Sequence, residues 1–350
     1  MFFCLRSFFP FTLTIFAVVV KPFHSLILFK FFILLIAAIL WREPREAAGE
    51  DPLFVMFWNL ENFFDWKTDP NQPNSSDEEF SSFGKRHWTK KKFIRKCQAI
   101  SKALFYIADE HGTLPDVIGV AEVENKAVLT LLLKETNLRL QDYEIVHYDS
   151  PDPRGIDVAL LYRKHRLKLL DSKPIGVSGD SLRPLLTRDI LLATFTIAGG
   201  DTVSFLVNHH PSKYGANSSW RRDAAMSVLE SVTDSILAAG QKRVVAMGDF
   251  NDIPSSAAEY SKKMVNMAAP LAAKGQGTIK YSGRWEMIDM FFISPFLHAH
   301  NPGIRMKVER LPFLMVKDNT HSGEKPFRTF TGPRYGGGVS DHCPITLVIQ

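Results

Sequence analysis

The chain has 350 residues, of which 45% are hydrophobic and 23% are charged. This composition excludes disordered and fibrous proteins and allows a sizeable core. The formal net charge at pH 7 is +5, part of which comes from five basic and three acidic side chains in residues 1–50. The remainder is nearly neutral, which neither requires nor excludes a polyanionic partner. Three widely spaced cysteines, Cys4, Cys97 and Cys343, exclude a disulfide scaffold and the usual zinc spacings.

Residues 1–50 differ in composition from the rest of the chain. Their apolar runs, Phe8 to Val20 and Phe23 to Trp41, are interrupted by charge, so neither is a clean stretch of about 20 uncharged residues that a spanning helix needs. The run after Lys30, followed by the small residues Ala47-Ala48-Gly49, is typical of a signal peptide. We predict a hydrophobic signal segment with a linker, an uncleaved membrane anchor being the second interpretation. Both place the following domain outside the cytoplasm, secreted or anchored; a cytoplasmic protein with an apolar N-terminal helix is the third alternative.

Residues 51–350 are predicted to form one domain in which helices alternate with short apolar strands. Three segments have apolar residues at helical spacing: Trp88 to His111, Ala127 to Leu140 and Ser219 to Ala239. Ten segments have the composition of strands: Phe54 to Trp58, Asp116 to Ala121, Glu144 to Tyr148, Asp157 to Arg163, Leu167 to Asp171, Ile190 to Ile197, Thr202 to Asn208, Val244 to Met247, Met287 to Ile293 and Ile345 to Ile349. Residues 67–84 are expected to form a surface loop, and residues 253–276 a helix and a loop. This order predicts an α/β fold in which two packed sheets are covered by helices.

Polar residues that folding alone would not select follow or interrupt several of these strands. They are Asn59 with Glu61, Glu122 with Glu124, Asn208 with His209, Asp249 with Asn251, Asp289, and Asp341 with His342. Each has a structural explanation by itself. Gly248 to Asp252 alone would more often be a turn, and Asp289 could be a buried acid satisfied by backbone donors. Six such positions in one chain indicate a functional site.

These residue types suit the hydrolysis of a phosphate ester. A hard divalent cation prefers carboxylate and amide oxygens, which Glu122 and Asn59 can supply. Asp249 can orient and deprotonate a water molecule, and Asp289 is the best candidate to hold an imidazolium at His342. An anionic phosphoryl group needs neutral or cationic donors, for which the candidates are Asn251, His209 and His342.

Several motifs occur in a characteristic order: Phe57 to Asn62, Ala121 to Asn125, Arg154 to Tyr162, Val207 to Ser212, Gly248 to Asp252, Trp285 to Asp289 and Ser340 to Pro344. On these motifs the chain, from about Phe54 to Ile349, resembles the endonuclease/exonuclease/phosphatase family. This metal-dependent superfamily includes pancreatic-type deoxyribonucleases, apurinic endonucleases, sphingomyelinases and inositol-polyphosphate phosphatases. The resemblance implies a four-layer α/β sandwich of two mixed sheets flanked by helices, with Mg²⁺ as cofactor and Mn²⁺ as a substitute in vitro.

The resemblance also implies roles for individual residues. The metal would be held by Glu122, with Asn59 beside it and Asp341 next to the metal or the water. Asp249 would activate the water. His209 would stand where deoxyribonuclease-like members have a second imidazole that protonates the leaving group; apurinic endonucleases have a tyrosine there. The phosphate would be contacted by Asn251 and by His342, supported by Asp289.

Four further residues are predicted to help bind the substrate: Asn208, Arg188, Arg222 and Trp285. Arg222 could equally be a solvated charge at the start of a helix, and Trp285 could simply pack.

The resemblance implies a reaction class and leaves the substrate open. Our first hypothesis is a nuclease-like phosphodiesterase that acts on nucleic acid as a monomer. The second is an enzyme directed at a phosphorylated lipid or inositol phosphate, which the N-terminal membrane segment keeps open. Against it, no aromatic-rich hairpin that would enter a bilayer is evident. A catalytically inactive binding module is the third, and it is disfavoured because each reactive position keeps its reactive residue type.

Overall fold

The computed structural model describes residues 52–68, 76–179, 185–213 and 218–350. The predicted signal or anchor segment, residues 1–50, lies outside the described residues, and its export function stays a prediction. Within the described ranges, none of the helices combines the length and the apolar character that crossing a bilayer requires.

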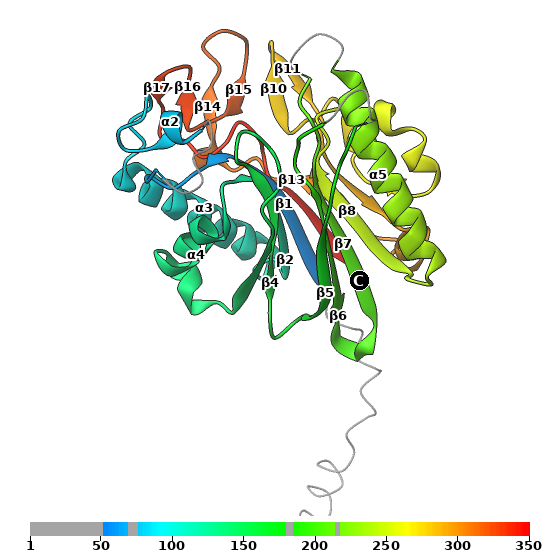
Figure 1. Cartoon of the computed structure of the whole chain (residues 1–350). Coiled ribbons are helices and arrows are strands. Elements are labelled where there is room, and N and C mark those ends of the chain that lie inside the picture. Colours follow the sequence, from blue (N-terminus) through cyan, green and yellow to red (C-terminus); the bar gives the residue numbers. More distant parts are fainter. Residues whose placement is uncertain (1–51, 69–75, 180–184, 214–217) are drawn as a thin grey trace, which may run out of the picture. The chain divides into compact units, whose positions relative to one another are not determined.

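Two six-stranded mixed sheets form the centre of the domain (Figure 1). The first has the order β13 (Met306–Val308), β18 (Ile345–Ile349), β1 (Leu53–Phe63), β2 (Val117–Val123), β4 (Asp157–Arg163), β3 (Tyr143–His147). The second has the order β5 (Lys168–Ile175), β6 (Ile190–Thr196), β7 (Thr202–His209), β8 (Arg243–Asp249), β12 (Asp289–Ile293), β9 (Val265–Asn266). Among the described strands, only two neighbouring pairs, β1–β2 and β7–β8, are parallel.

Each central strand is buried on both faces, so its alternate side chains enter two different cores. On β1, Val55 and Phe57 join the core between the sheets, where Phe205 of β7 and Met247 of β8 also lie. The intervening β1 residues join the core under the helices of the first sheet, together with Phe93, Cys97 and Ile100. The near-continuous apolar runs of the sequence therefore reflect burial from two sides.

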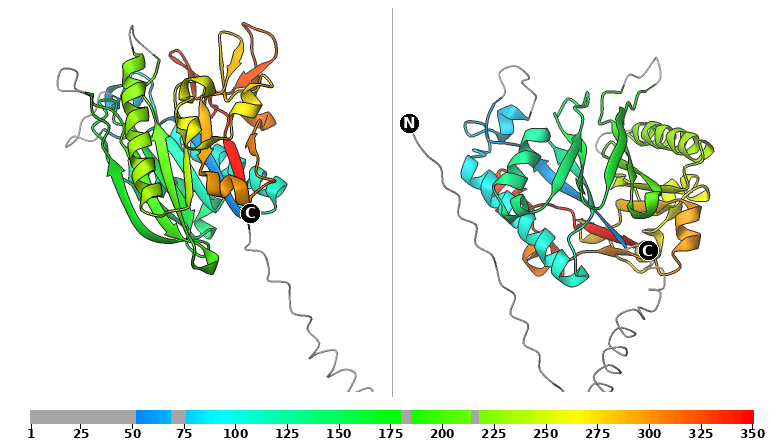
Figure 2. Two further views of the ribbon diagram at one scale, coloured as in Figure 1. Left: turned by 90° about the vertical axis from the view of Figure 1, so that its right-hand side faces the viewer. Right: turned by 90° about the horizontal axis from the view of Figure 1, so that it is seen from below.

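Helices cover both outer faces and complete four layers. The right-hand view of Figure 2 shows α3 (Lys90–His111) and α4 (Lys126–Lys134) outside the first sheet and α5 (Ser219–Ala238) outside the second. The side chain of Thr89 accepts a hydrogen bond from Lys92 N and so caps α3, which ends at Gly112 in the left-handed region at φ 78°. The shorter helices are α2 (Asp77–Phe80), α6 (Ala269–Ala272) and α7 (Pro295–His300).

The predicted α/β sandwich is confirmed, and the differences lie in short elements. Ala127 to Leu140 is not one helix, because α4 ends at Lys134 and a 3₁₀ turn follows at Asn137–Leu140. Residues 253–276 hold 3₁₀ turns, β9 and α6 in place of a longer helix. The sequence did not predict β13 or three hairpins: β10–β11 (Ile279–Tyr281, Arg284–Glu286), β14–β15 (Met315–Lys317, Glu324–Pro326) and β16–β17 (Phe330–Thr331, Arg334–Tyr335). Strands of two or three residues are too short to show a periodicity.

The strand directions bring the polar positions to one edge. The carboxyl ends of the parallel pairs β1–β2 and β7–β8 point the same way, and antiparallel β12 begins there. Register places His209 opposite Asp249 and Asp249 opposite Asp289, in one row across three strands. The three hairpins lie at this end of the sandwich (Figure 1).

Gly248, next to that row, is required by the close approach of β7. A Cβ added at Gly248 would lie 2.3 Å from the carbonyl oxygen of Asn208, well inside contact distance. Because that oxygen is backbone in a paired strand, it cannot move aside cheaply.

We therefore expect Gly248→Ala to lower the free energy of unfolding by about 2 kcal/mol, the cost of overpacking a close-packed site. Gly303→Ala is the matched control, since a Cβ there has no neighbouring atom within 4 Å. It should change stability by no more than ~0.5 kcal/mol. Denaturant unfolding of the two variants measures the difference; equal stabilities would show that β7 and β8 can separate without cost.

Candidate active site

Asp249, the last residue of β8, lies at the centre of the polar row and is buried, with 1% of its surface exposed. Its Oδ2 accepts a hydrogen bond from Asn59 Nδ2 at 3.0 Å, and its Oδ1 accepts one from the backbone N of Asn251 at 2.9 Å. Burial and the nearby carboxylate of Asp289 raise the pKa of Asp249 to about 7, against the opposing effect of His342. A carboxylate with such a pKa can take a proton near neutral pH.

His342 and Asp289 form a buried pair beside Asp249. His342 Nδ1 donates to Asp289 Oδ2 at 2.8 Å, and its Nε2 lies 3.8 Å from Asp249 Oδ2. Burial opposes a charge on His342, but the carboxylates of Asp289 and Asp249 outweigh it and hold the pKa of His342 well above its ordinary value. At neutral pH the imidazole is therefore a cation that presents Nε2–H to the site.

The segment that carries His342 is anchored to β1. Ser340 Oγ donates to Asn59 O at 2.6 Å and accepts from His342 N at 3.0 Å. Trp58 Nε1 donates to His342 O at 2.9 Å. These contacts explain why a motif next to the last strand ends up beside the first.

His209, the last residue of β7, is the second buried imidazole. Its Nε2 lies 3.7 Å from Asp249 Oδ2 and 4.0 Å from Glu122 Oε1. Burial, followed by the positive charges of Arg188 and Arg154, lowers the pKa of His209 well below its ordinary value. Unlike His342, His209 is thus neutral at pH 7.

Three carboxylates, Glu61, Glu122 and Asp341, lie at the carboxyl ends of β1 and β2 and before β18. Glu61 and Asp341 share one guanidinium, since Arg328 Nη2 lies 2.9 Å from Glu61 Oε1 and 3.0 Å from Asp341 Oδ2. Burial, and to a lesser extent the charge of Asp341, raises the pKa of Glu61 to about 7.

Fully buried Lys96 is the second cation of this cluster. Its ammonium donates to Glu61 O and to Thr329 Oγ1 and interacts with all three carboxylates. Burial lowers the pKa of Lys96 to about 8, in spite of those carboxylates.

The donor set fits a hard divalent cation, because Glu61, Glu122 and Asp341 offer only carboxylate oxygens. The role of Asn59 beside the metal stays a prediction, and the structure gives the side chain a second role. Its Oδ1 accepts from Glu61 N at 2.9 Å and its Nδ2 donates to Asp249, so the amide orients Asp249.

Among the described residues, two groups of side chains bring three possible ligand atoms within 4.8 Å of one another: Asp249 with Asp289 and His342, and His147 with Asp149 and Asp157. The oxygens of Glu61, Glu122 and Asp341 do not form such a group. In the first, a protonated His342 bonded to Asp289 repels a cation and cannot ligate one. In the second, His147 Nε2 is already paired with Asp157 Oδ2 at 3.1 Å. The carboxylates of Glu61, Glu122 and Asp341 match the ligand chemistry of a hard cation. A bound cation would have to displace the Arg328 guanidinium, which pairs with Glu61 and Asp341.

The structure brings the predicted core of the site together, namely Asn59, Glu122, His209, Asp249, Asn251, Asp289, Asp341 and His342. Asn251 stands at φ 50° and donates through Nδ2 to His210 O at 2.9 Å, and its second amide hydrogen is available to a phosphate. Positive φ at Glu61 (47°), Glu122 (59°) and Asn251 is an uncommon conformation that is concentrated at this site.

Two predicted substrate-binding residues need correction. Asn208 is completely buried and its Nδ2 donates to Leu206 O and Met247 O, so it cannot reach a substrate. Arg188 is also buried, paired with Asp152, and lies beneath the site.

The other two keep some access to solvent. Arg222 binds Asp252 Oδ2 at 3.0 Å with 12% of its side chain exposed. Trp285, on β11, is partly buried, and the Arg310 guanidinium lies 3.9 Å from its ring centroid.

The sequence did not single out Arg328, Lys96 or Arg154 as site residues, and Glu61 was noted only as a polar strand end. Arg328 and Arg154 lie in loops, where isolated charged residues are common and do not indicate a functional site. Lys96 lies in an amphipathic helix, where a lysine usually belongs to the solvent-exposed face. Of these four residues, only Glu61 could be noticed in the sequence, because it follows Asn59 by two residues at the end of an apolar strand.

Comparisons with known proteins agree with this fold. The sequence profile of the Endonuclease/Exonuclease/phosphatase family matches residues 54–350. The chain belongs to this family. The family places the chain among phosphoester hydrolases, and no match was found among curated proteins.

Solved structures show the same fold. A truncated TDP2 of Caenorhabditis elegans matches with a TM-score of 0.55 and 15% identity, covering 85% of this chain and 97% of that one. The catalytic domain of human nocturnin with bound sulfate has a TM-score of 0.52 and 18% identity, covering 86% and 95%. A mannosyl-6-phosphatase of Bacteroides thetaiotaomicron has a TM-score of 0.52 and 14% identity, covering 85% and 100%. At these identities the likeness establishes the fold alone.

Asp289 is expected to keep His342 protonated, and Asp289→Asn removes the foremost carboxylate that raises this pKa. The pKa of His342 should then fall. A raised folded-state pKa stabilises the fold at and below neutral pH, and this contribution is lost only as pH rises through that raised value. Histidine NMR titration of the metal-free protein measures the change directly, with exposed His298 as internal reference. An unchanged His342 titration would contradict the assigned pair.

Proposed function

We propose that the protein is a divalent-metal-dependent phosphodiesterase of nuclease type, with Mg²⁺ as its cofactor and Mn²⁺ as a substitute. The observation that carries the proposal is the placement of Asp249. It lies within 4 Å of both a neutral imidazole, His209, and a cationic one, His342, next to the oxygen cluster of Glu61, Glu122 and Asp341. Phosphate-ester hydrolysis requires groups of these kinds: a base, hydrogen-bond donors and a site for a cation. Here they are Asp249, one neutral and one cationic imidazole, and the acidic oxygen cluster.

In this mechanism Asp249 orients the attacking water and accepts its proton. Asn59 and the backbone of Asn251 hold the carboxylate in place, and its pKa of about 7 leaves a large basic fraction at pH 7 to 8. Because hydrogen bonds hold both carboxylate oxygens, Asp249 does not have to move in order to act on the water.

His342 and Asn251 bind the phosphoryl oxygens. The imidazolium of His342, fixed by Asp289, provides a charged donor from a buried position, where an electrostatic interaction is stronger than in water. Neutral His209 faces Asp249 and Glu122 from the other strand, and we assign it a hydrogen-bonding role toward the leaving-group oxygen. Glu61, Glu122 and Asp341 would hold the cation, which when bound supplies Lewis-acid polarisation of the phosphate.

A nucleic-acid substrate is favoured by two structural neighbours. A TDP2 of Danio rerio, 16% identical with a TM-score of 0.51, was crystallised with a single-stranded DNA product. Nocturnin binds a sulfate, an anion of phosphate shape, in its catalytic domain. Another structural neighbour is a mannosyl-6-phosphatase, so a phosphorylated small molecule is the alternative substrate to test.

Asp249→Asn and His342→Ala are each expected to lower kcat on the order of 10²-fold or more, because each removes a group that acts in the transition state. Hydrolysis of bis(p-nitrophenyl) phosphate with Mg²⁺ measures the loss. Arg305→Ala, at an exposed loop remote from the row, is the control and should keep wild-type rates. Wild-type kcat in either site variant would remove that residue from the mechanism.

A substrate comparison tests the nuclease assignment. We expect cleavage of plasmid DNA, single-stranded DNA or RNA, dependent on Mg²⁺, abolished by chelator, and weakening steeply with salt as phosphate contacts are screened. Sphingomyelin, inositol phosphates and mannose 6-phosphate should be poor substrates. Preferential turnover of any of these three would replace the nuclease assignment within the same reaction class, and a requirement for Zn²⁺ would contradict the oxygen-only metal site.

A further inference from the structure

The loop between β3 and β4 carries two charged side chains that reach opposite halves of the site. Asp152 lies against Arg188, which precedes β6 in the second sheet. Arg154 reaches the carboxyl end of β2 in the first sheet, where its Nη2 lies 3.6 Å from Glu122 Oε2. One short loop thus contacts both Arg188, which lies next to His209, and the carboxylate of Glu122.

Arg188 is buried with its guanidinium shared among three acceptors. Nη1 donates to Asp152 Oδ2 at 2.9 Å, Nη2 to His210 O at 2.7 Å and Nε to His209 O at 3.2 Å. Only 7% of the Arg188 side chain and 4% of the Asp152 side chain are exposed. These contacts leave Arg188 pointed at protein groups and away from a substrate.

The carbonyls that Arg188 holds lie where the pairing of β7 ends. His209 is the last residue of β7 and is opposite Asp249 in the register with β8. Directly after His209, one backbone hydrogen bond from His210 N to Asp249 O at 2.8 Å still joins this segment to β8. The planar guanidinium adds contacts to the carbonyls of His209 and His210, and an ammonium could not bind the three acceptors in one plane.

The same contacts reach Asn251. His210 O accepts from both Arg188 Nη2 and Asn251 Nδ2, at 2.7 and 2.9 Å. Displacement of this carbonyl would therefore move the amide that faces the phosphate as well as the imidazole of His209.

Asp152 links Arg188 to the carboxylate of Glu122. Its second oxygen, Oδ1, accepts from the backbone N of Arg154 at 2.9 Å. Arg154 Nη2 in turn donates to Asn62 Oδ1 at 2.9 Å, and Asn62 N donates to Glu122 Oε2 at 2.7 Å. A continuous series of contacts joins Arg188 to Glu122 through Asp152.

We propose that Asp152 and Arg188 are positioning residues that set His209 and Asn251 relative to Glu122. This role rests on the proposed phosphodiesterase function, in which His209 and Asn251 contact the reacting group. A buried ion pair contributes little net stability over a well-packed apolar pair, so its use here lies in geometry.

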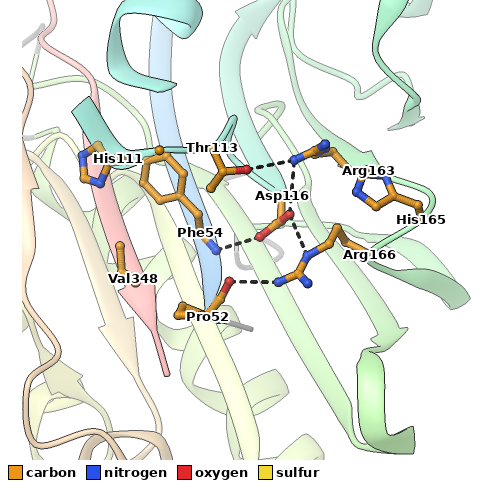
Figure 3. Close-up of a pocket in the computed structure, with 10 residues that line it drawn as sticks. Pro52, Phe54, His111, Thr113, Asp116, Arg163, His165, Arg166 and Val348 are labelled. Atoms are coloured by element: carbon orange, nitrogen blue, oxygen red, sulfur yellow. Dashed lines mark hydrogen bonds and ion pairs between the residues drawn. The ribbon is translucent and has the colours of Figure 1, made fainter. Parts of the chain in front are cut away.

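The chain supplies a matched control at the opposite end of β2 (Figure 3). Asp116, immediately before β2, is buried and accepts from Phe54 N at 3.0 Å and from Arg166 Nε at 3.1 Å. This pair borders a hollow of about 470 Å³ that Thr113, Arg163 and His165 also line. It has the same chemistry as Asp152–Arg188, and it lies at the end of β2 remote from Glu122.

The first test compares Arg188→Lys with Arg166→Lys on bis(p-nitrophenyl) phosphate. Both variants should lower Tm. Only Arg188→Lys should lower kcat, on the order of 10-fold to 10²-fold for a displaced catalytic group, with KM nearly unchanged. A raised KM at unchanged kcat would show that Arg188 binds substrate, and an equal loss in Arg166→Lys would reduce the effect to general destabilisation. Either result overturns the proposal.

The second test needs no activity. Hydrogen exchange of residues 205–213 should accelerate in Arg188→Lys and stay unchanged in Arg166→Lys. Mn²⁺ affinity measured by calorimetry should hold in Arg188→Lys, which leaves Arg154 and Glu122 in place. Unaltered exchange in Arg188→Lys would overturn the positioning role. A wild-type protein inactive on every phosphodiester would refute the proposed function, while these two measurements still decide whether the pair fixes the end of β7.

Discussion

Burial of the Asp249 carboxylate is the constraint on which the rest of the site depends. A negative charge removed from water is costly unless donors and positive charge surround it. Asn59, the Asn251 backbone and the His342 cation meet that requirement from three different parts of the chain. Since these partners come from β1, from the turn after β8 and from the segment before β18, the site can form only when both sheets have packed.

Strand pairing supplies the required precision. The parallel pairs β1–β2 and β7–β8 end at the same edge, and the register of β8 with β12 places Asp289 opposite Asp249. The backbone leaves regular strand geometry at that edge, with positive φ at Glu61, Glu122 and Asn251. Such conformations persist only where surrounding contacts determine them, as the bond from Asn62 N to Glu122 Oε2 illustrates.

Sequence reasoning predicted the sheets, the main helices and the residues of the polar row, because apolar strands and the polar residues at their ends leave local patterns. It failed for Asn208, which neighbours His209 on β7. Successive strand residues point to opposite faces, so a site-facing His209 turns Asn208 into the protein. Arg188 was predicted to bind substrate and Arg328 was not singled out, because their partners lie far along the chain, at Asp152 and at Glu61 with Asp341. Local sequence contains no signal for such long-range pairing.

The two imidazoles show how position alone assigns different chemistry to one residue type. Both are buried, which by itself disfavours the charged form. His342 faces Asp289 and Asp249 and becomes a cation, whereas His209 lies near Arg188 and Arg154 and stays neutral. If the two surroundings were exchanged, His209 would be a cation beside Glu122 and would compete with a metal ion. His342 would then be a neutral ring beside the phosphate. Arg188 therefore acts on His209 twice, through the backbone that it holds and through its charge.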